Sequence, residues 1–314
     1  MPDSPRTSDK FSFWDPTGDV VVAAIGIRHR IHSNVLFAET SLSAADTFTA
    51  VNGSTYFSVI LLDDDSKDVF YFLMALYKFG ELCNRVEEPM PLLAALSLAT
   101  KYNAYTLQLQ LFEKLAFWYP PTLEGWDNYW RSDYSVWELA STNWLTHYQM
   151  SFSAVSILRR AGAIHLLPAA LIRCCERPVE HILHGFRTNK SGSYQLSEED
   201  KQYVEAAWQP LTDMAKDQVF PLLFGRNPAN HQCQDRSCYE YRNQIKQIWW
   251  LTNSDGFCNP VKHVFDAQWR IDKMKMCEAC YREISDAYLQ NRKVAWGSLP
   301  HIFGLQPAEA DIGI

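Results

Sequence analysis

The sequence predicts an α+β protein, with a short sheet and surrounding helices in its first part and a mainly α-helical second part. Residues 20–32 and 56–62 have the composition of strands, whereas from residue 69 onward apolar side chains recur at helical spacing. Consecutive prolines at 120–121 mark a boundary between two parts of ordinary domain size. We therefore expect a disordered lead-in over residues 1–12, a first domain over 13–120 and an α-helical domain over 121–314.

The first strands are predicted to form a hairpin. Three valines at 20–22 are β-branched and favour a strand. In residues 27–32, Ile, His and Ile alternate with Arg, Arg and His, which is the period of a half-buried strand. Gly26 takes positive φ without cost, so the turn is expected there. Ser33 or Asn34 can then accept hydrogen bonds from the free N–H groups of a following helix.

The same patterns place the remaining elements. A buried strand over 56–62 ends at the three aspartates 63–65, which lack the spacing of a calcium loop and are expected to cap the next helix. We expect helices over residues 44–51, 69–79, 91–102, 107–118, 136–144, 153–161, 168–176 and 265–288, one more after a near capping box at Ser197, and a docked apolar tail over 296–305. Gly80 is expected to end the second of these helices, and Pro210 to kink or break the one after Ser197.

The composition predicts an intracellular protein without a membrane span. A net charge of −7 over 314 residues argues against a broad nucleic-acid surface, which requires clustered Lys and Arg. No apolar run approaches the ~18–20 residues of a membrane span. Residues 1–10 lack the apolar core of a signal peptide. The eight cysteines are therefore expected to be reduced thiols or metal ligands.

No common catalytic signature is present, and we expect no enzymatic activity. The chain lacks a Gly-x-Ser-x-Gly elbow, a Gly-x-Gly-x-x-Gly loop, a phosphate loop and a His-Glu-x-x-His motif. His181 and His184 are spaced to share a helix face, which is typical of a polar surface pair and is also compatible with metal ligation. Cys174 and Cys175 lie in an apolar helical segment, which predicts two small buried side chains.

Four other cysteines have the spacing of a metal site. Cys233-x4-Cys238 and Cys277-x2-Cys280 form two close pairs, and four thiolates can hold one tetrahedral zinc ion. Cys277 and Cys280 are one helical turn apart, so both sulfurs can face the same ion. The zinc is expected to be structural, because four protein ligands leave no open position for a water nucleophile.

Two alternatives to this ligand set follow from the same stretch. Cys258 and the imidazoles of His231 and His263 are close enough in the sequence to replace one of the four ligands. Alternatively, the second pair consists of small buried residues on a helix and the first pair lies in an unrelated loop. A zinc knuckle usually has two-residue spacing in both pairs, which only Cys277 and Cys280 satisfy.

Several short motifs occur in the order seen in a known family. They are Phe13-Trp14-Asp15-Pro16, Asp19-Val20-Val21, the stretch from Ile31 to Leu36 and the stretch from Leu92 to Asn103. This series resembles the BTB/POZ domain in the form common in fungal proteins. That family has an aspartate opening its first strand, here Asp19, and a histidine before its first helix, here His32. Lysine usually follows this histidine, but here it is Ser33, and the hairpin turn is shorter than usual.

The second part also resembles these fungal proteins, in which the BTB domain precedes a helical region with scattered cysteines. Their typical ending is matched by Trp296, Leu299-Pro300 and Phe303-Gly304-Leu305. The resemblance implies a protein–protein interaction module that forms homodimers or heterodimers, by analogy of fold. Apolar side chains around Val35-Leu36 and Phe48 are candidates for the dimer surface. The resemblance implies protein partners, whereas the net charge and the lack of a long apolar run argue against nucleic-acid and membrane partners, and no small-molecule substrate is identified from the sequence.

Two other functions of such domains stay open. Adaptors of cullin-type ubiquitin ligases usually carry a hydrophobic-x-Glu motif, and the corresponding residues 49–54 contain no glutamate, so we expect weak or no cullin binding. Transcription regulators also carry BTB domains. The acidic net charge and the lack of Cys2His2 finger spacing argue against that role.

Overall fold

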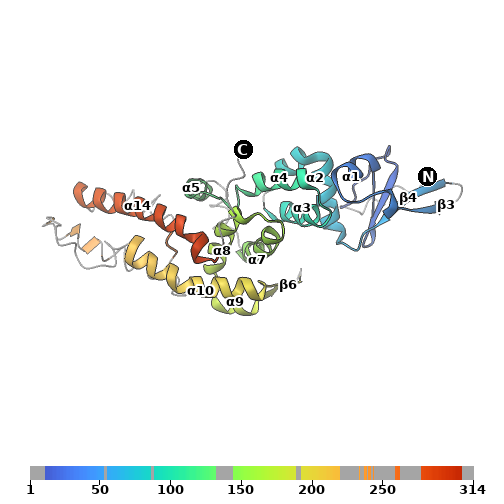
Figure 1. Cartoon of the computed structure of the whole chain (residues 1–314). Coiled ribbons are helices and arrows are strands. Elements are labelled where there is room, and N and C mark those ends of the chain that lie inside the picture. Colours follow the sequence, from blue (N-terminus) through green and yellow to red (C-terminus); the bar gives the residue numbers. More distant parts are fainter. Residues whose placement is uncertain are drawn as a thin grey trace. The chain divides into compact units, whose positions relative to one another are not determined.

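The computed structural model describes two compact units of the chain (Figure 1). The described residues are 11–52, 55–85, 88–131, 144–188, 192–219, 233, 237–238, 240–241, 243, 259–261 and 277–305. The first unit comprises Met1–Trp118 and Ile157–Ala163, and the second comprises Tyr119–Ser156 and Ile164–Ile314. Both sheet and helices are present, so the prediction of an α+β protein is confirmed.

A small sheet with strand order β2-β1-β4-β3 lies in the first unit. Its strands are β1 (Val20–Ala24), β2 (Ile27–Ile31), β3 (Phe48–Asn52) and β4 (Thr55–Leu61). β1 pairs antiparallel with β2 and parallel with β4, and β3 pairs antiparallel with β4. Gly26 has a φ of +78° in the turn between β1 and β2, as predicted. Val22, His29 and Ile60 are paired across these strands and are buried on the core face.

Helices complete the first unit. They are α1 (Ser33–Glu39), α2 (Ser66–Arg85), α3 (Met90–Lys101) and α4 (Tyr105–Leu115). The helices predicted over 91–102 and 107–118 are confirmed to within three residues at each end. As predicted, the Asp65 carboxylate caps α2 by accepting a hydrogen bond from the N–H of Lys67 at 2.9 Å.

Two expectations for this unit are wrong. The helix predicted over 44–51 is a single 3-10 turn, Ala44–Asp46, followed by the strand β3. Pairing of this β-branched and aromatic stretch with β4 extends the sheet, which outweighs a weak helical pattern. Helix α2 also continues past Gly80, and its backbone departs from helical geometry at Lys78 instead, with φ −140° and ψ 45°.

The lead-in is shorter than predicted. Phe11 packs its ring against that of Phe70, with 5.7 Å between the ring centroids, and the Ser12 hydroxyl donates to the carbonyl of Arg28 at 2.8 Å. Residues 11 and 12 are therefore part of the folded unit. Residues 1–10 lie outside the described part of the chain.

The second unit is mostly helical but also contains a hairpin. Its elements are α5 (Leu123–Arg131), α7 (Trp144–Arg160), a 3-10 turn (Ile164–Leu166), α8 (Leu167–Cys175), α9 (Val179–His184), β5 (Phe186–Thr188), β6 (Gly192–Tyr194), α10 (Glu198–Met214), a π-helical turn (Ala215–Val219) and α14 (Glu278–Ile302). The helices predicted over 153–161 and 168–176 are confirmed within α7 and α8. The prediction over 136–144 lies outside the described residues, apart from its last one. The antiparallel hairpin β5–β6 contradicts our expectation that this part is helical to its end.

Helix α10 begins as predicted and is not broken at Pro210. The Ser197 hydroxyl caps it by accepting from the N–H of Asp200 at 3.0 Å. Pro210 lies inside the helix, which continues to Met214. An interior proline removes one backbone donor and crowds the preceding turn. Val204 and Leu211, which lie on either side of Pro210, are both buried, and this burial holds the helix against the rest of the unit.

The last helix, α14, differs from the prediction over 265–288 at both ends. It begins at Glu278 and continues to Ile302, while residues 265–276 lie outside the described part of the chain. The predicted tail is therefore mostly helical. Its docking is confirmed, because the side chains of Leu299 and Phe303 are fully buried.

Two buried arginines join distant elements of the second unit. Arg292 of α14 donates to both carboxylate oxygens of Asp127 in α5, at 3.1 and 2.5 Å, and to the carbonyl of Val261 at 2.7 Å. Arg173 of α8 places its guanidinium 4.4 Å from the ring centre of Tyr129 in α5. The first of these contacts fixes the helix whose N-terminus carries two of the predicted metal ligands.

Candidate metal centre

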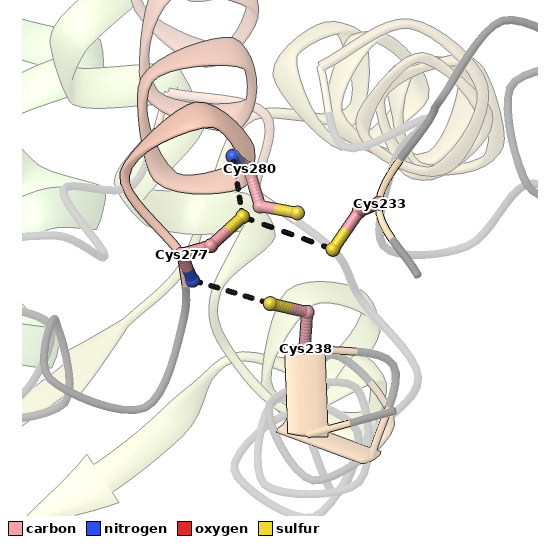
Figure 2. A group of neighbouring side chains, drawn as sticks. All are labelled: Cys233, Cys238, Cys277 and Cys280. Carbon is pink, nitrogen blue, oxygen red and sulfur yellow. Dashed lines mark hydrogen bonds between the residues drawn. The ribbon is translucent and has the colours of Figure 1, made fainter. Parts of the chain in front are cut away.

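The four predicted metal ligands lie together in the second unit (Figure 2). The sulfurs of Cys233, Cys238, Cys277 and Cys280 all lie within 4.8 Å of one another. Cys277 is the N-cap residue of α14 and Cys280 lies in its first turn. The alternative in which the two pairs lie apart is therefore wrong.

Hydrogen bonds between the cysteines orient the sulfurs. The Cys277 N–H donates to the Cys238 sulfur at 3.2 Å, and the Cys280 N–H donates to the Cys277 sulfur at 3.5 Å. The sulfurs of Cys233 and Cys277 are 3.7 Å apart. This is close to the ~3.7 Å edge of a tetrahedron with Zn–S bonds of ~2.3 Å.

The four cysteines differ in exposure, and the surroundings of three of them shift the pKa of the thiol. Cys238 and Cys280 are buried, at 2% and 1% exposed, whereas Cys233 and Cys277 are half-buried. The N–H of Cys280 lowers the pKa of the Cys277 thiol to about 7, because it stabilises the thiolate. Burial raises the pKa of Cys238 and Cys280. The Cys277 thiol is thus more acidic than an ordinary cysteine, and a bound cation would favour the thiolate form of every sulfur that it contacts.

Other predicted candidates do not join this cluster. Cys174 and Cys175 are fully buried in α8, and burial raises the pKa of each, so the prediction of two small buried side chains is confirmed. His181 is half-buried and His184 is exposed on α9, and neither belongs to a metal-competent group in the described residues. The three possible substitute ligands, His231, Cys258 and His263, lie outside the described part of the chain.

A four-thiolate cluster has a restricted chemistry. Across the residues that the structure describes, this is the one group of three or more Cys, His, Asp or Glu side chains that could hold a metal ion. With all four thiolates bound, a tetrahedral ion has no position left for water or substrate. The cluster can therefore join the segment of Cys233 and Cys238 to the start of α14, and it offers no site for hydrolytic chemistry.

Sequence analysis did not identify Arg292, which supports the cluster by anchoring α14. A signal for it exists in the sequence. Tyr288, Arg292 and Leu299 lie on one stripe of α14 that is buried in the unit, so Arg292 is a charge within an apolar stripe. Its partner Asp127 is 165 positions away, and no local pattern connects the two.

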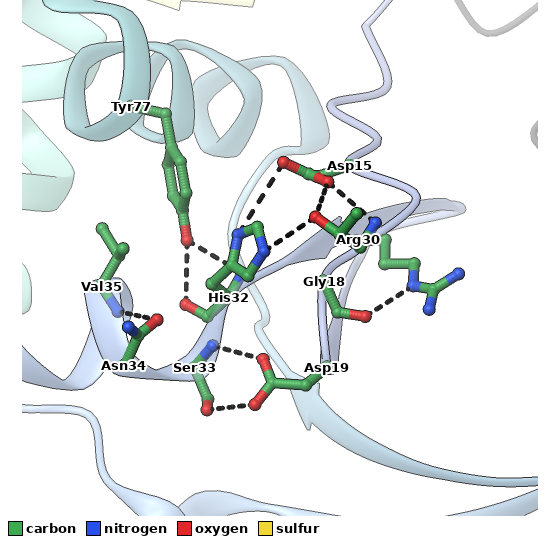
Figure 3. Close-up of polar contacts among 10 residues, drawn as sticks. Asp15, Gly18, Asp19, Arg30, His32, Ser33, Asn34, Val35 and Tyr77 are labelled. Atoms are coloured by element: carbon green, nitrogen blue, oxygen red, sulfur yellow. Dashed lines mark hydrogen bonds and ion pairs between the residues drawn. The ribbon is translucent and has the colours of Figure 1, made fainter.

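A separate polar cluster surrounds the start of α1 in the first unit (Figure 3). His32 is the N-cap residue and provides no side-chain cap. The Asp19 carboxylate instead accepts from the N–H and the hydroxyl of Ser33, at 2.7 and 2.6 Å. Of the two residues predicted as possible acceptors, Ser33 therefore donates rather than accepts. The Asn34 side-chain oxygen does accept from the N–H of Val35, at 2.9 Å.

Comparison with protein-family models, with curated proteins and with solved structures gave no match. Among the helices of the described residues, none has the length and apolar character needed to cross a membrane.

Proposed function

We propose that this chain is a non-enzymatic, intracellular protein–protein interaction module whose second unit is held by one structural zinc ion. The observation that carries the proposal is the convergence of Cys233, Cys238, Cys277 and Cys280 within 4.8 Å. Four sulfur donors in a compact arrangement favour zinc or iron among the biological metals, and a zinc ion with four thiolates is closed to catalysis. A structural role follows from this ligand set.

Metal analysis of the purified full-length chain tests the zinc. We expect one zinc per chain, and we expect Cys280→Ser to lose most of it, because Cys280 is a buried ligand. Cys83→Ser is the matched control, since Cys83 is a half-buried cysteine of the first unit. It should retain the full zinc content. A chain that contains no metal, or iron with a visible absorption band, contradicts the proposal.

The N-terminal unit supports the interaction part of the proposal. The BTB/POZ resemblance implies a short sheet with surrounding helices. The aspartate and the histidine that are typical of this family, here Asp19 and His32, both lie at the start of α1. Asp19 binds Ser33 directly after His32, and the Tyr77 hydroxyl donates to the His32 carbonyl at 2.9 Å (Figure 3). These contacts fasten the start of the first strand to the start of the first helix and to α2.

The dimer surface must differ from the one we expected around Val35-Leu36. Leu36 is 1% exposed and belongs to the core. Phe48 remains exposed, although on a strand, and Leu61 is 67% exposed. Phe48 pairs with Val59, two residues before Leu61 on β4, so both exposed side chains lie on the outer face of the sheet. We assign this face to a second copy of the chain.

Measurement of the solution mass by light scattering tests the dimer. At tens of micromolar, we expect twice the chain mass of 36.2 kDa. Leu61→Asp should shift the mass toward one chain, whereas Leu109→Asp, at a residue 64% exposed on α4, should not. A monomeric wild-type chain contradicts self-association. A stoichiometric cullin recovered with the protein would favour the adaptor function instead.

A further inference from the structure

The metal centre is asymmetric in a way that bears on oxidation. Cys233 and Cys277 are half-buried, and their sulfurs lie 3.7 Å apart. Cys238 and Cys280 are almost completely buried, at 2% and 1% exposed. The two less buried cysteines therefore come from the two segments that the proposed metal joins (Figure 2).

We propose that this centre is redox-sensitive: a hydroperoxide converts Cys233 and Cys277 into a disulfide, and the metal leaves. This inference rests on the proposed zinc ion. Loss of two of four ligands leaves only Cys238 and Cys280, and structural zinc requires four. The centre thus has two states, one joined by metal and one joined by a covalent bond.

The reaction is balanced with hydrogen peroxide as the oxidant. The Cys277 thiolate attacks one peroxide oxygen, so that an S–O bond forms and the O–O bond breaks, and the departing hydroxide takes a proton to become water. The Cys233 thiolate then attacks the Cys277 sulfur, the S–S bond forms, and the second hydroxide leaves as water. Two thiolates lose two electrons, and peroxide gains them. Zinc leaves as Zn²⁺, and the other two thiolates each take up a proton.

Geometry favours this pair. The hydrogen bond from the Cys280 N–H holds the Cys277 sulfur at the N-terminus of α14, where the dipole of a 25-residue helix favours a thiolate. Cys233 presents its sulfur to it from a segment 44 positions away. Cys280 is less accessible as the second partner because it is buried. The disulfide would keep the Cys233 segment attached to α14 after the metal has gone.

The test begins with the zinc-loaded full chain. Hydrogen peroxide is added in steps, released zinc is measured with a chelating dye, and disulfides are mapped by mass spectrometry of alkylated, unreduced peptides. We expect one zinc released for each Cys233–Cys277 disulfide formed, and reversal by a dithiol in the presence of zinc. The Cys83→Ser variant should give the same result, because Cys83 lies outside the centre.

A second variant separates ligation from oxidation. Cys233→His keeps a zinc ligand that cannot form a disulfide. We expect it to bind zinc and to release it at least about tenfold more slowly under peroxide. Release at the wild-type rate by a zinc-loaded Cys233→His chain overturns the inference.

The outcomes distinguish the two proposals. A chain that holds no zinc before peroxide is added overturns the zinc proposal and the release together. A chain that keeps its zinc while Cys83 becomes oxidised overturns the redox inference and leaves the zinc proposal intact. A disulfide between Cys277 and Cys280, or between any other pair, overturns the assignment to Cys233 and Cys277.

Discussion

Both units of this protein have an apolar core, but the second unit also joins distant segments of the chain through polar and sulfur side chains. In the first unit, a sheet and four helices share an apolar core, in which Val22, Leu93 and Leu111 are fully buried. In the second unit, segments far apart in the sequence meet through polar or sulfur side chains, namely Arg292 with Asp127 and the four cysteines. We therefore expect single changes at Arg292 or at the four cysteines to destabilise the second unit and to leave the first unit largely unchanged.

Metal removal should have the largest effect, and it should affect the second unit much more than the first. Structural zinc contributes on the order of 10 kcal/mol in small zinc domains, because the ligands have no preformed site in the unfolded chain. With a strong chelator, we expect faster amide exchange in α14 and little change in β1 or α3, which belong to the first unit. Hydrogen exchange read by mass spectrometry measures both in one sample.

Re-addition of zinc is the control for the chelator, and it should restore the exchange pattern of α14. If amide exchange became equally faster in both units, the first unit would also depend on the metal. Unchanged exchange in α14 of a chain shown to have lost zinc would mean that Arg292 and the apolar stripe suffice to hold this helix.

The next largest effect is expected at Arg292. Arg292→Met removes the cation and leaves Asp127 largely buried without it, which typically costs about 3–5 kcal/mol. The matched control is Arg282→Met on the same helix, whose ion pair with Glu278 is exposed on both sides. Such a pair contributes at most about 1 kcal/mol. Chemical denaturation of the two variants measures the difference in free energy of unfolding.

A double variant shows whether the Asp127 charge causes the loss of stability in Arg292→Met. Replacing both partners, as Arg292→Met with Asp127→Leu, should destabilise less than Arg292→Met alone, because the largely buried carboxylate no longer remains without its arginine. If the double variant is as unstable as the sum of the two single variants, the loss comes from packing of the long arginine side chain against Tyr288.

The sequence predicted the first unit better than the second, and the reason is physical. The hairpin around Gly26 and the helices near 91–102 and 107–118 follow from local periodicity, which one short window contains. The stretch 44–51 failed because its helical pattern was overridden by pairing with β4, a contact that local propensity does not contain.

The cluster of four cysteines was predictable because the spacing of two close cysteine pairs is visible in the sequence. The contacts that hold the surrounding elements in place were not predictable from the sequence. The contact of Arg292 with Asp127 joins residues 165 positions apart, and the hairpin β5–β6 consists of two three-residue strands without a strong alternating pattern. Contacts of this kind depend on the assembled unit rather than on any local window.

The smallest change in stability is expected at a buried polar side chain in the apolar core of the first unit. His29 is fully buried, its Nδ1 accepts from the N–H of Phe13 at 3.1 Å, and its Nε2 has no partner among the described residues. Burial lowers the pKa of His29 from 6.5 to about 4. As the pH falls, the unfolded chain therefore binds a proton first. Stability of the first unit should decrease by about 3 kcal/mol between pH 6.5 and pH 4, with no further contribution below that range.

Comparing the pH dependence of stability in the wild type and in His29→Asn isolates the contribution of this one side chain. Asparagine offers an acceptor where Nδ1 lies but does not titrate, so the variant should lose part of its stability at neutral pH and most of its pH dependence over this range. Exchange of the amides in β1 and β2 reports the first unit alone, which matters because acid also protonates the cysteine ligands of the second unit. If wild type and variant lose stability equally on acidification, His29 does not titrate differently in the folded and unfolded chain. The acid sensitivity would then come from the carboxylates at the start of α1, where hydrogen bonds from Thr17 lower the pKa of Asp15.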